Sequence, residues 1–163
     1  MSKPILLLSG VPGSGKSCYG RWLAKNKAYL HLDLEHGDLE KYGLQRVWDE
    51  FWSSRSDGLI SALLETAAPV CLDWGFPPRC LPIVRRLADV DVELWWFEAD
   101  PHLAKKYFLE RATVSEAAFD EQMANIEASR RAIMELFGQH VIRVFREDGM
   151  RVPCEEIYAQ MFK

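Results

Sequence analysis

A glycine-rich turn near the start of the chain contains a single lysine followed by a serine. Residues 10–17, GVPGSGKS, satisfy the pattern G-x-x-x-x-G-K-[ST], with an apolar run before them and a helical stretch after them. Backbone N–H groups in such a turn form an anion nest, and the positive end of the following helix adds to it. The residues predicted to bind the phosphates of a nucleotide are Gly10, Gly13, Ser14, Gly15, Lys16, Ser17 and Cys18.

Two side chains of this turn have specific tasks in a phosphate site. Lys16 can reach the β- and γ-phosphates as a flexible cation, and the Ser17 hydroxyl suits a Mg²⁺ ion. The turn therefore predicts ATP as the ligand, together with Mg²⁺. The chain has no complete N-K-x-D segment of the kind that reads guanine, which argues against a GTPase.

Two aspartates fall where predicted strands end. Asp33 follows the apolar run AYLHL, and Asp73 follows PVCL. In a parallel sheet the chemistry lies at the carboxyl ends of the strands, so both carboxylates should face the phosphate loop. We predict Asp33 as the catalytic base or hydroxyl-orienting group, with Glu35 as a second candidate, and Asp73 with Ser17 as the Mg²⁺ contacts.

Each aspartate also has a purely structural interpretation. Asp33 suits a helix N-cap or a turn, because its short carboxylate accepts hydrogen bonds from nearby backbone N–H groups. Asp73 could instead make a hydrogen bond that shapes the loop 73–79, DWGFPPR.

The elements that would position these residues follow from hydrophobic patterning. Apolar runs alternating with helical stretches predict an α/β protein with a mostly parallel five-stranded sheet. The predicted strands are residues 4–9, 28–33, 69–73, 91–98 and 140–145. The predicted helices are residues 15–26, 39–53, 57–66, 79–88, 101–111, 117–136 and 153–162. No repeat or linker interrupts the pattern, so we predict a single domain over residues 1–163.

Composition excludes several classes of protein. The 163 residues are 48% hydrophobic and 27% charged, and no apolar run is long enough to cross a bilayer. A net charge of -4 disfavours a protein that holds long nucleic acid by its phosphates. The cysteines form no C-x-x-C pair, which argues against a zinc site and a disulfide framework. We therefore expect a cytoplasmic protein, monomeric or homodimeric, that does not bind membranes. Nucleic acid is disfavoured as a partner, although the charge does not exclude a short RNA end.

Four segments together resemble a known family. They are GVPGSGKS at residues 10–17, YLHLDLE at 29–35, CLDWGFPPR at 71–79 and VELWWFEADP at 92–101. The chain resembles the small P-loop kinases of the adenylate kinase-like group, which include shikimate kinase, gluconate kinase, chloramphenicol phosphotransferase and polynucleotide kinase. It is also similar to short bacterial AAA-domain ATP-binding proteins that carry an L-D-W-G-F segment. The phosphate loop is the most specific of these segments.

The resemblance implies a layout for the whole chain. It implies a three-layer P-loop NTPase fold with strand order 2-3-1-4-5, a substrate-binding region at about residues 35–66 and a short lid at about 111–120. Many relatives carry two arginines about a turn apart on the helix after the fourth strand. Here Arg111 occupies the second position and Tyr107 the first. Arg111 is thus expected to stabilise charge on the transferring phosphate, the alternative being a cation at a helix C-terminus.

Aromatic residues suggest where an acceptor could bind. Trp48, Phe51 and Trp52 have helical spacing, which is typical of a core-facing stripe. The alternative is a wall of the acceptor pocket, shared with Trp74 and Phe76 from the loop after the third strand. A planar or hydrophobic alcohol would suit such a wall.

Several charged residues complete the candidates. Arg55 and Arg79 lie near these aromatics in the sequence and could pair with an acidic group on the acceptor, or could simply lie on the surface. The predicted substrate-binding residues are Glu35, Arg55, Trp74 and Arg79. The resemblance implies adenine binding at the loop after the fifth strand, with Arg146 and Gly149 as candidates.

These features favour an ATP-dependent kinase that transfers the γ-phosphate to the hydroxyl group of a small molecule. Two alternatives stay open. Tyr107 in place of an arginine favours a nucleotide-binding regulatory ATPase, in which ATP occupancy sets a conformation. A polynucleotide 5′-hydroxyl kinase is disfavoured by the acidic balance.

Overall fold

A parallel sheet forms the centre of the molecule. The computed structural model describes residues 3–55, 57–111 and 114–163. The strands are β1 Ile5–Gly10, β2 Leu30–Asp33, β3 Val70–Asp73, β4 Glu93–Glu98 and β5 Val141–Arg143. They pair in the order β2-β3-β1-β4-β5, and all four pairings are parallel. This arrangement confirms the predicted fold class and strand order.

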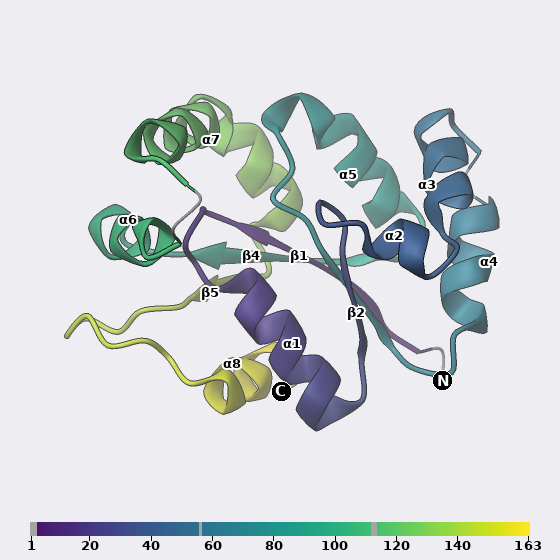
Figure 1. Cartoon of the computed structure of the whole chain (residues 1–163), viewed down its shortest axis with the longest axis horizontal. Coiled ribbons are helices and arrows are strands. Elements are labelled where there is room, and N and C mark those ends of the chain that lie inside the picture. Colours follow the sequence, from purple (N-terminus) through teal and green to yellow (C-terminus); the bar gives the residue numbers. More distant parts are fainter. Residues whose placement is uncertain (1–2, 56, 112–113) are drawn as a thin grey trace.

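Helices cover both faces of the sheet. They are α1 Lys16–Lys27, α2 Asp38–Lys41, α3 Gln45–Trp52, α4 Asp57–Glu65, α5 Leu81–Asp89, α6 Pro101–Leu109, α7 Glu116–Phe137 and α8 Cys154–Met161, with a 3₁₀ turn at Pro78–Cys80. In Figure 1, α1 and α8 lie below the sheet, α5 and α7 lie above it, and α3 and α4 stand together at one end. The molecule is therefore a three-layer sandwich, as right-handed crossovers between parallel strands require.

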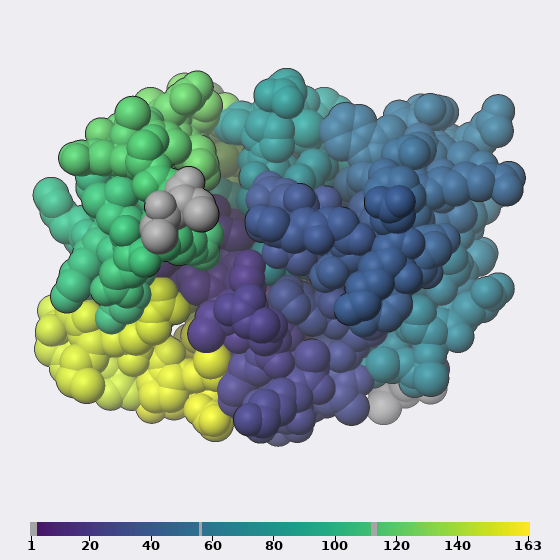
Figure 2. Space-filling model, viewed as in Figure 1, coloured from purple at the N-terminus to yellow at the C-terminus, as the bar shows by residue number. Residues whose placement is uncertain are grey.

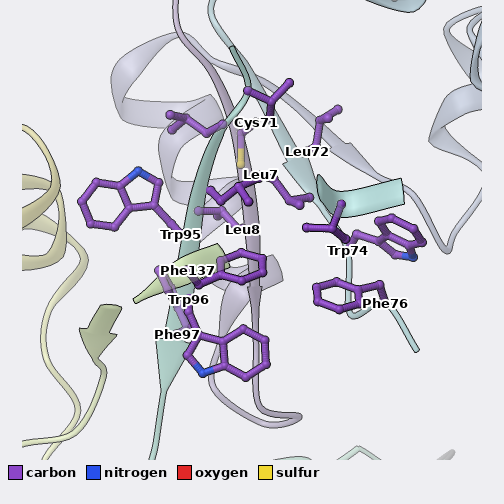
Figure 3. Packing of buried hydrophobic residues seen from close by; sticks show 14 of the residues in the cluster. Leu7, Leu8, Cys71, Leu72, Trp74, Phe76, Trp95, Trp96, Phe97 and Phe137 are labelled. Atoms are coloured by element: carbon purple, nitrogen blue, oxygen red, sulfur yellow. The ribbon is translucent and has the colours of Figure 1, made fainter. Parts of the chain in front are cut away.

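The central strands are apolar on both sides because both sides are covered. Every residue of β1 and β3 is buried, as expected for strands inside a parallel sheet. Trp95 and Trp96 are adjacent on β4 and point to opposite faces, as Figure 3 shows. Trp95 stacks on His140 at 4.4 Å between ring centroids, and Trp96 packs edge-on against Phe137 at 5.5 Å. The core is thus continuous through the sheet.

One predicted helix is wrong in extent. Residues 39–53, expected as a single helix, form two helices, α2 and α3, separated by a turn. Gly43 has φ of 69°, in the left-handed region, and the N–H of Leu44 donates to the carbonyl of Leu39 at 2.7 Å. A left-handed glycine of this kind ends a helix. The apolar spacing continues through the break, so periodicity alone could not detect it.

The turn between α2 and α3 lets α3 pack its aromatic stripe against the loop after β3. Trp48 and Phe51 are buried, whereas Trp52 is exposed. Trp48 meets Trp74 edge-on, with ring centroids 5.4 Å apart. These contacts agree with the core-facing interpretation of the stripe.

In the described ranges, none of the helices combines the length and apolar character that a membrane span requires.

Candidate active site

The carboxyl ends of the strands open onto one large cavity. Its volume is about 780 Å³, and its walls come from the phosphate loop, the ends of β2 and β3, and helices α6 and α7. Figure 2 shows the purple surface of the first residues recessed between the green surface of α6 and α7 and the blue surface around α2. The predicted residues that line this cavity are Gly10, Gly13, Lys16, Ser17, Asp33, Glu35, Asp73 and Arg111.

The phosphate loop has the backbone that an anion nest needs. Gly13 and Gly15 have φ of 77° and 87°, so both lie in the left-handed region. A Cβ atom on Gly13 would collide with the carbonyl oxygen of Ala104 in α6. Within the described residues, the N–H groups of Gly13 and Gly15 donate no backbone hydrogen bond. The loop therefore presents donors to a ligand while packing tightly on the helix behind it.

Lys16 begins α1 and lies half-buried beside the loop. Burial lowers the pKa of Lys16, and the charge of Arg111 adds to this shift, while the carboxylates of Asp73 and Glu35 oppose it. Its ammonium group makes one long hydrogen bond, 3.4 Å, to the carbonyl of Val11. A cation that makes a single long hydrogen bond and faces the cavity is suited to an anionic ligand. The buried Ser14 hydroxyl, which has no partner among the described atoms, is a second polar group in the same loop.

Asp73 at the end of β3 is held by a histidine that the sequence gave no reason to select. His31 Nε2 lies 3.0 Å from Asp73 Oδ2, and both side chains are almost fully buried. Burial by itself would raise the pKa of Asp73, but the hydrogen bonds from His31 and Ser17 and the charge of Lys16 hold it below its usual range. Asp73 is therefore an ionised carboxylate at pH 7, placed beside Ser17.

His31 occupies space that a glycine leaves open. A Cβ atom on Gly20 of α1 would collide with the imidazole ring of His31. Since α1 packs against β2 and β3, the absence of a side chain at position 20 lets the ring lie between helix and sheet and reach Asp73. No sequence motif marks this pair, because its members lie on different elements.

These residues fit a magnesium nucleotide. The described residues contain no group of three or more histidine, cysteine or acidic side chains that could hold a metal by themselves. Mg²⁺ commonly binds through one or two protein oxygens, substrate phosphates and water. The Ser17 hydroxyl and the ionised Asp73 carboxylate beside the phosphate loop are a donor set of that kind.

Asp33 and Glu35 share the end of β2 but differ in their surroundings. Asp33 Oδ1 accepts a hydrogen bond from the N–H of Glu35 at 3.0 Å, and Asp33 Oδ2 contacts His36 Nδ1 at 2.8 Å. This hydrogen bond raises the pKa of the exposed His36. Asp33 thus shapes the turn that carries Glu35, which agrees with the structural interpretation of Asp33, although its side chain also reaches the cavity.

Glu35 is the less constrained acid. Burial raises the pKa of Glu35, and the charge of Lys16 opposes that shift. Its Oε1 atom would lie 3.6 Å from a Cβ atom built on Gly75, whose other neighbour is the Lys16 side chain. Gly75 therefore lies between the carboxylate and the lysine, and its lack of a side chain leaves space there.

A second arginine reaches the phosphate loop from a direction that the sequence did not suggest. Residues 145 and 151 pair in an antiparallel bridge after β5, and Arg151 donates to the carbonyls of Gly13 at 3.1 Å and Ser14 at 3.4 Å. Its guanidinium lies 4.6 Å from the Tyr107 ring centre and 5.2 Å from that of Phe145. Tyr107, which replaces an arginine of the family pattern, thus supports an arginine from another element.

Several predicted residues lie away from the cavity. Arg55 lines a separate surface hollow on α3 with Gln45 and Arg46. Trp74 is buried in the aromatic cluster, next to Trp48 and Phe76, as Figure 3 shows for Trp74 and Phe76. In the part of the chain that the structure describes, the cavity walls do not include Cys18, Arg55, Trp74, Arg79, Arg146 or Gly149.

The hairpin after β5 explains two of these placements. Arg146 pairs with Glu156 of α8 at 2.5 Å, and Gly149 has φ of 82° in the turn. Arg151 is the hairpin residue that contacts the phosphate loop. The sequence had pointed to this loop, FREDGMR at residues 145–151, but the residue chosen from it was Arg146 rather than Arg151.

The predicted substrate region and lid contribute unequally to the cavity. From residues 35–66, the described lining consists of Glu35 and His36. Of the predicted lid, residues 112–113 lie outside the described residues, whereas Arg111, Val114, Ser115 and Ala118 line the cavity. Gln122 and Asn125 of α7 also line it; the sequence offered only their helical spacing, which does not identify a binding residue.

No protein-family model matches the sequence, and comparison with curated proteins yields no match. Solved structures do show a similar arrangement. A shikimate kinase from Bacteroides thetaiotaomicron has a TM-score of 0.59 at 15% identity, covering 96% of this chain and 95% of that one. A gluconokinase from Sinorhizobium meliloti has a TM-score of 0.52 at 16% identity, covering 98% and 90%.

A tunicamycin resistance protein from Deinococcus radiodurans has a TM-score of 0.61 at 18% identity, covering 98% of this chain and 96% of that protein. At identities this low, structural likeness speaks for the fold alone. The strand order, the phosphate loop at the end of β1 and these similarities lead to one conclusion: this chain has the three-layer α/β fold of the small P-loop kinases.

Proposed function

We propose that this protein is an ATP-dependent phosphotransferase that moves the γ-phosphate of ATP to a hydroxyl group of a small molecule. The observation that supports it most is the convergence of Lys16, Ser17, Asp73 and Glu35 on a single cavity. A phosphate loop alone supports nucleotide binding. A carboxylate in the same cavity, near Lys16, adds a means of activating an acceptor.

The phosphate loop and Arg111 would hold the nucleotide. Backbone donors of Gly13 and Gly15 and the Lys16 ammonium bind the phosphate oxygens, and Arg111 adds a second cation at the cavity wall. Ser17 and Asp73 would hold Mg²⁺, whose charge offsets that of the phosphates. His31 keeps Asp73 oriented by its hydrogen bond.

Glu35 is our choice for the base. Its carboxylate would accept the proton of the acceptor hydroxyl while that oxygen bonds to the γ-phosphorus and the bond to the departing ADP breaks. A raised pKa makes Glu35 a better proton acceptor than an ordinary carboxylate. Asp33, the first candidate from the sequence, would support this step by fixing the turn before Glu35.

The direct test measures acceptor-dependent formation of ADP. The protein is incubated with Mg·ATP and a panel of hydroxyl compounds, with Lys16→Ala as the inactive control. We expect ADP release to rise with at least one acceptor and a phosphorylated product to appear by mass spectrometry. If ATP binds but no acceptor raises ADP release above its background, the protein is not a small-molecule kinase, and a nucleotide-dependent regulator becomes the better interpretation.

A further inference from the structure

The cavity beside the phosphate loop has a second end that the phosphotransfer residues do not use. That end is bordered by α7, β4 and the loop after β3, and we call it the α7 end. The apolar lining residues that come from these elements are Phe76, Pro77, Pro78, Trp96, Ala118, Ile126 and Ile133. It is this end, rather than the loop or its acids, that can select an acceptor.

The floor of the α7 end is rigid and apolar. Trp96 and Ile133 are each 1% exposed, and Phe76 is 7% exposed, yet all of them border the cavity. The Trp96 indole N–H already donates to Glu98 at 3.2 Å, so this ring offers a ligand an apolar surface and no donor. Phe76 and Trp96 both pack on Phe137, as Figure 3 illustrates. Ring packing of this kind holds the floor in one shape.

Neutral amides supply the polar contacts at this end. Gln122 and Asn125 lie three residues apart on α7, and therefore on one helix face with Ala118 and Ile126. Hydrogen bonds within the described residues involve neither side-chain amide. Each amide offers both a donor and an acceptor, which suits hydroxyl and carbonyl groups and supplies no charge.

The charges in the cavity argue against an acidic acceptor. Among the described lining residues, the basic groups are Lys16, Arg111 and the His36 imidazole, which contacts Asp33, and the acids are Asp33, Glu35 and Asp73. Lys16 and Arg111 are close enough for the charge of Arg111 to lower the pKa of Lys16, so both cations lie at the phosphate end. Arg130 of α7 lies near this end but is paired with Glu98 and Glu127. An acceptor carboxylate at the α7 end would thus find no unpaired cation among the described lining residues there, and would be repelled by the three acids and the nucleotide phosphates.

We infer that the acceptor is an uncharged hydroxyl compound that also carries an apolar ring or chain, with Gln122 and Asn125 binding its polar groups and the apolar residues of the α7 end binding that ring or chain. This inference rests on the proposed kinase function and gives it a substrate class. The class differs from shikimate and gluconate, both of which carry an ionised carboxylate at neutral pH. A similar fold therefore does not imply that these proteins phosphorylate the same acceptor.

The test uses matched ligands and measures binding, so that it does not depend on turnover. The protein is held with Mg²⁺ and a non-hydrolysable ATP analogue, and calorimetry measures the binding of 4-nitrophenyl β-glucoside, 4-nitrophenyl β-glucuronide and methyl β-glucoside. The second ligand adds a carboxylate to the first, and the third replaces its aromatic ring by a methyl group. We expect the first to bind at least tenfold more tightly than either of the others.

Variants of α7 make the assignment specific. Gln122→Leu and Asn125→Leu should each weaken binding of the neutral aryl glucoside at least fivefold, whereas Gln139→Leu, on an exposed residue that does not line this cavity, should leave it unchanged. Asn125→Arg should reverse the preference and favour the glucuronide. Gln122→Arg serves the same purpose if Asn125→Arg does not fold.

Three outcomes would overturn the inference. They are equal or tighter binding of the glucuronide by the unaltered protein, equal binding of the methyl glucoside, and no binding of the aryl glucoside at millimolar concentration. Each is distinct from failure of the proposed function, which is judged by ADP release in the acceptor panel. A protein that phosphorylates acidic sugars would thus be a kinase and would refute this substrate class.

Discussion

Glu35 and Asp33 are two residues apart, yet their contacts give them different chemistry. The pKa of Glu35 is raised by burial, so its basic form is lost as pH falls through a value above that of an ordinary glutamate, about 4.3. The Asp33 carboxylate accepts a hydrogen bond from the N–H of Glu35 and contacts the His36 imidazole. Sequence reasoning preferred Asp33 because it stands at the strand end; only the hydrogen bonds distinguish the acid that shapes the turn from the acid that is available.

We predict that Glu35→Gln lowers kcat by about 10²–10⁴-fold, the usual contribution of general base catalysis. The acid limb of the kcat profile should disappear with it, because glutamine does not titrate. Measurement of kcat between pH 4.5 and 9 tests this. Asp33→Asn should slow the reaction less and keep the acid limb; a greater loss in Asp33→Asn, or an unchanged limb in Glu35→Gln, would return the role of base to Asp33.

Arg151 permits a second prediction about a single side chain. Arg151→Ala removes donors to the carbonyls of Gly13 and Ser14, and hydrogen bonds to charged groups contribute about 1.5–3 kcal/mol each. We expect the Kd for Mg·ATP, measured by calorimetry, to increase about tenfold or more. Arg146→Ala is the matched control from the same hairpin, since Arg146 pairs with Glu156 instead, and its Kd should remain unchanged.

The phosphate loop, as an element, depends on the helix packed behind it. Gly13 and Gly37 have nearly the same φ, 77° and 83°, but different surroundings. A Cβ atom at Gly13 meets the carbonyl of Ala104 in α6, whereas one at Gly37 has nothing within 4 Å. The two glycines therefore separate the effect of backbone conformation from the effect of close packing.

Gly37→Ala should cost about 1–2 kcal/mol, the penalty of a left-handed residue with a Cβ atom. Gly13→Ala should cost more and should also abolish nucleotide binding, because the loop or α6 must move. Thermal unfolding and calorimetry of both variants check this expectation. Equal losses of stability, with nucleotide binding kept in both, would show that the loop tolerates a side chain against α6.

Periodicity predicted most of the elements, and its failures have local causes. The strands were placed correctly because buried parallel strands are apolar on both faces, as β1 and β3 are. The break between α2 and α3 was missed because it depends on the backbone of Gly43. Likewise, the α7 residues of the cavity depend on how that helix lies over β4, which no local pattern encodes.

For the molecule as a whole, we expect ligand binding and folding to be coupled, because the phosphate loop connects the central strand β1 to helix α1. A ligand at 100 times its Kd stabilises the folded state by about 2.7 kcal/mol. For a domain of this size we therefore expect saturating Mg·ATP to raise Tm by roughly 5–10 °C. Differential scanning fluorimetry measures the shift. Lys16→Ala should show little of this Tm shift. If Mg·ATP does not change the Tm of the unaltered protein, nucleotide binding itself is contradicted.

The sandwich of α1 against the sheet also constrains how this sequence can vary. His31 reaches Asp73 through the space that Gly20 leaves, although Gly20 and His31 lie on different elements. In homologous chains, a larger residue at position 20 should occur only with a smaller one at position 31, and such chains should lack this partner for the β3 carboxylate. Correlated substitution of these two sites is therefore an evolutionary signature by which homologues that keep the His31–Asp73 contact can be recognised.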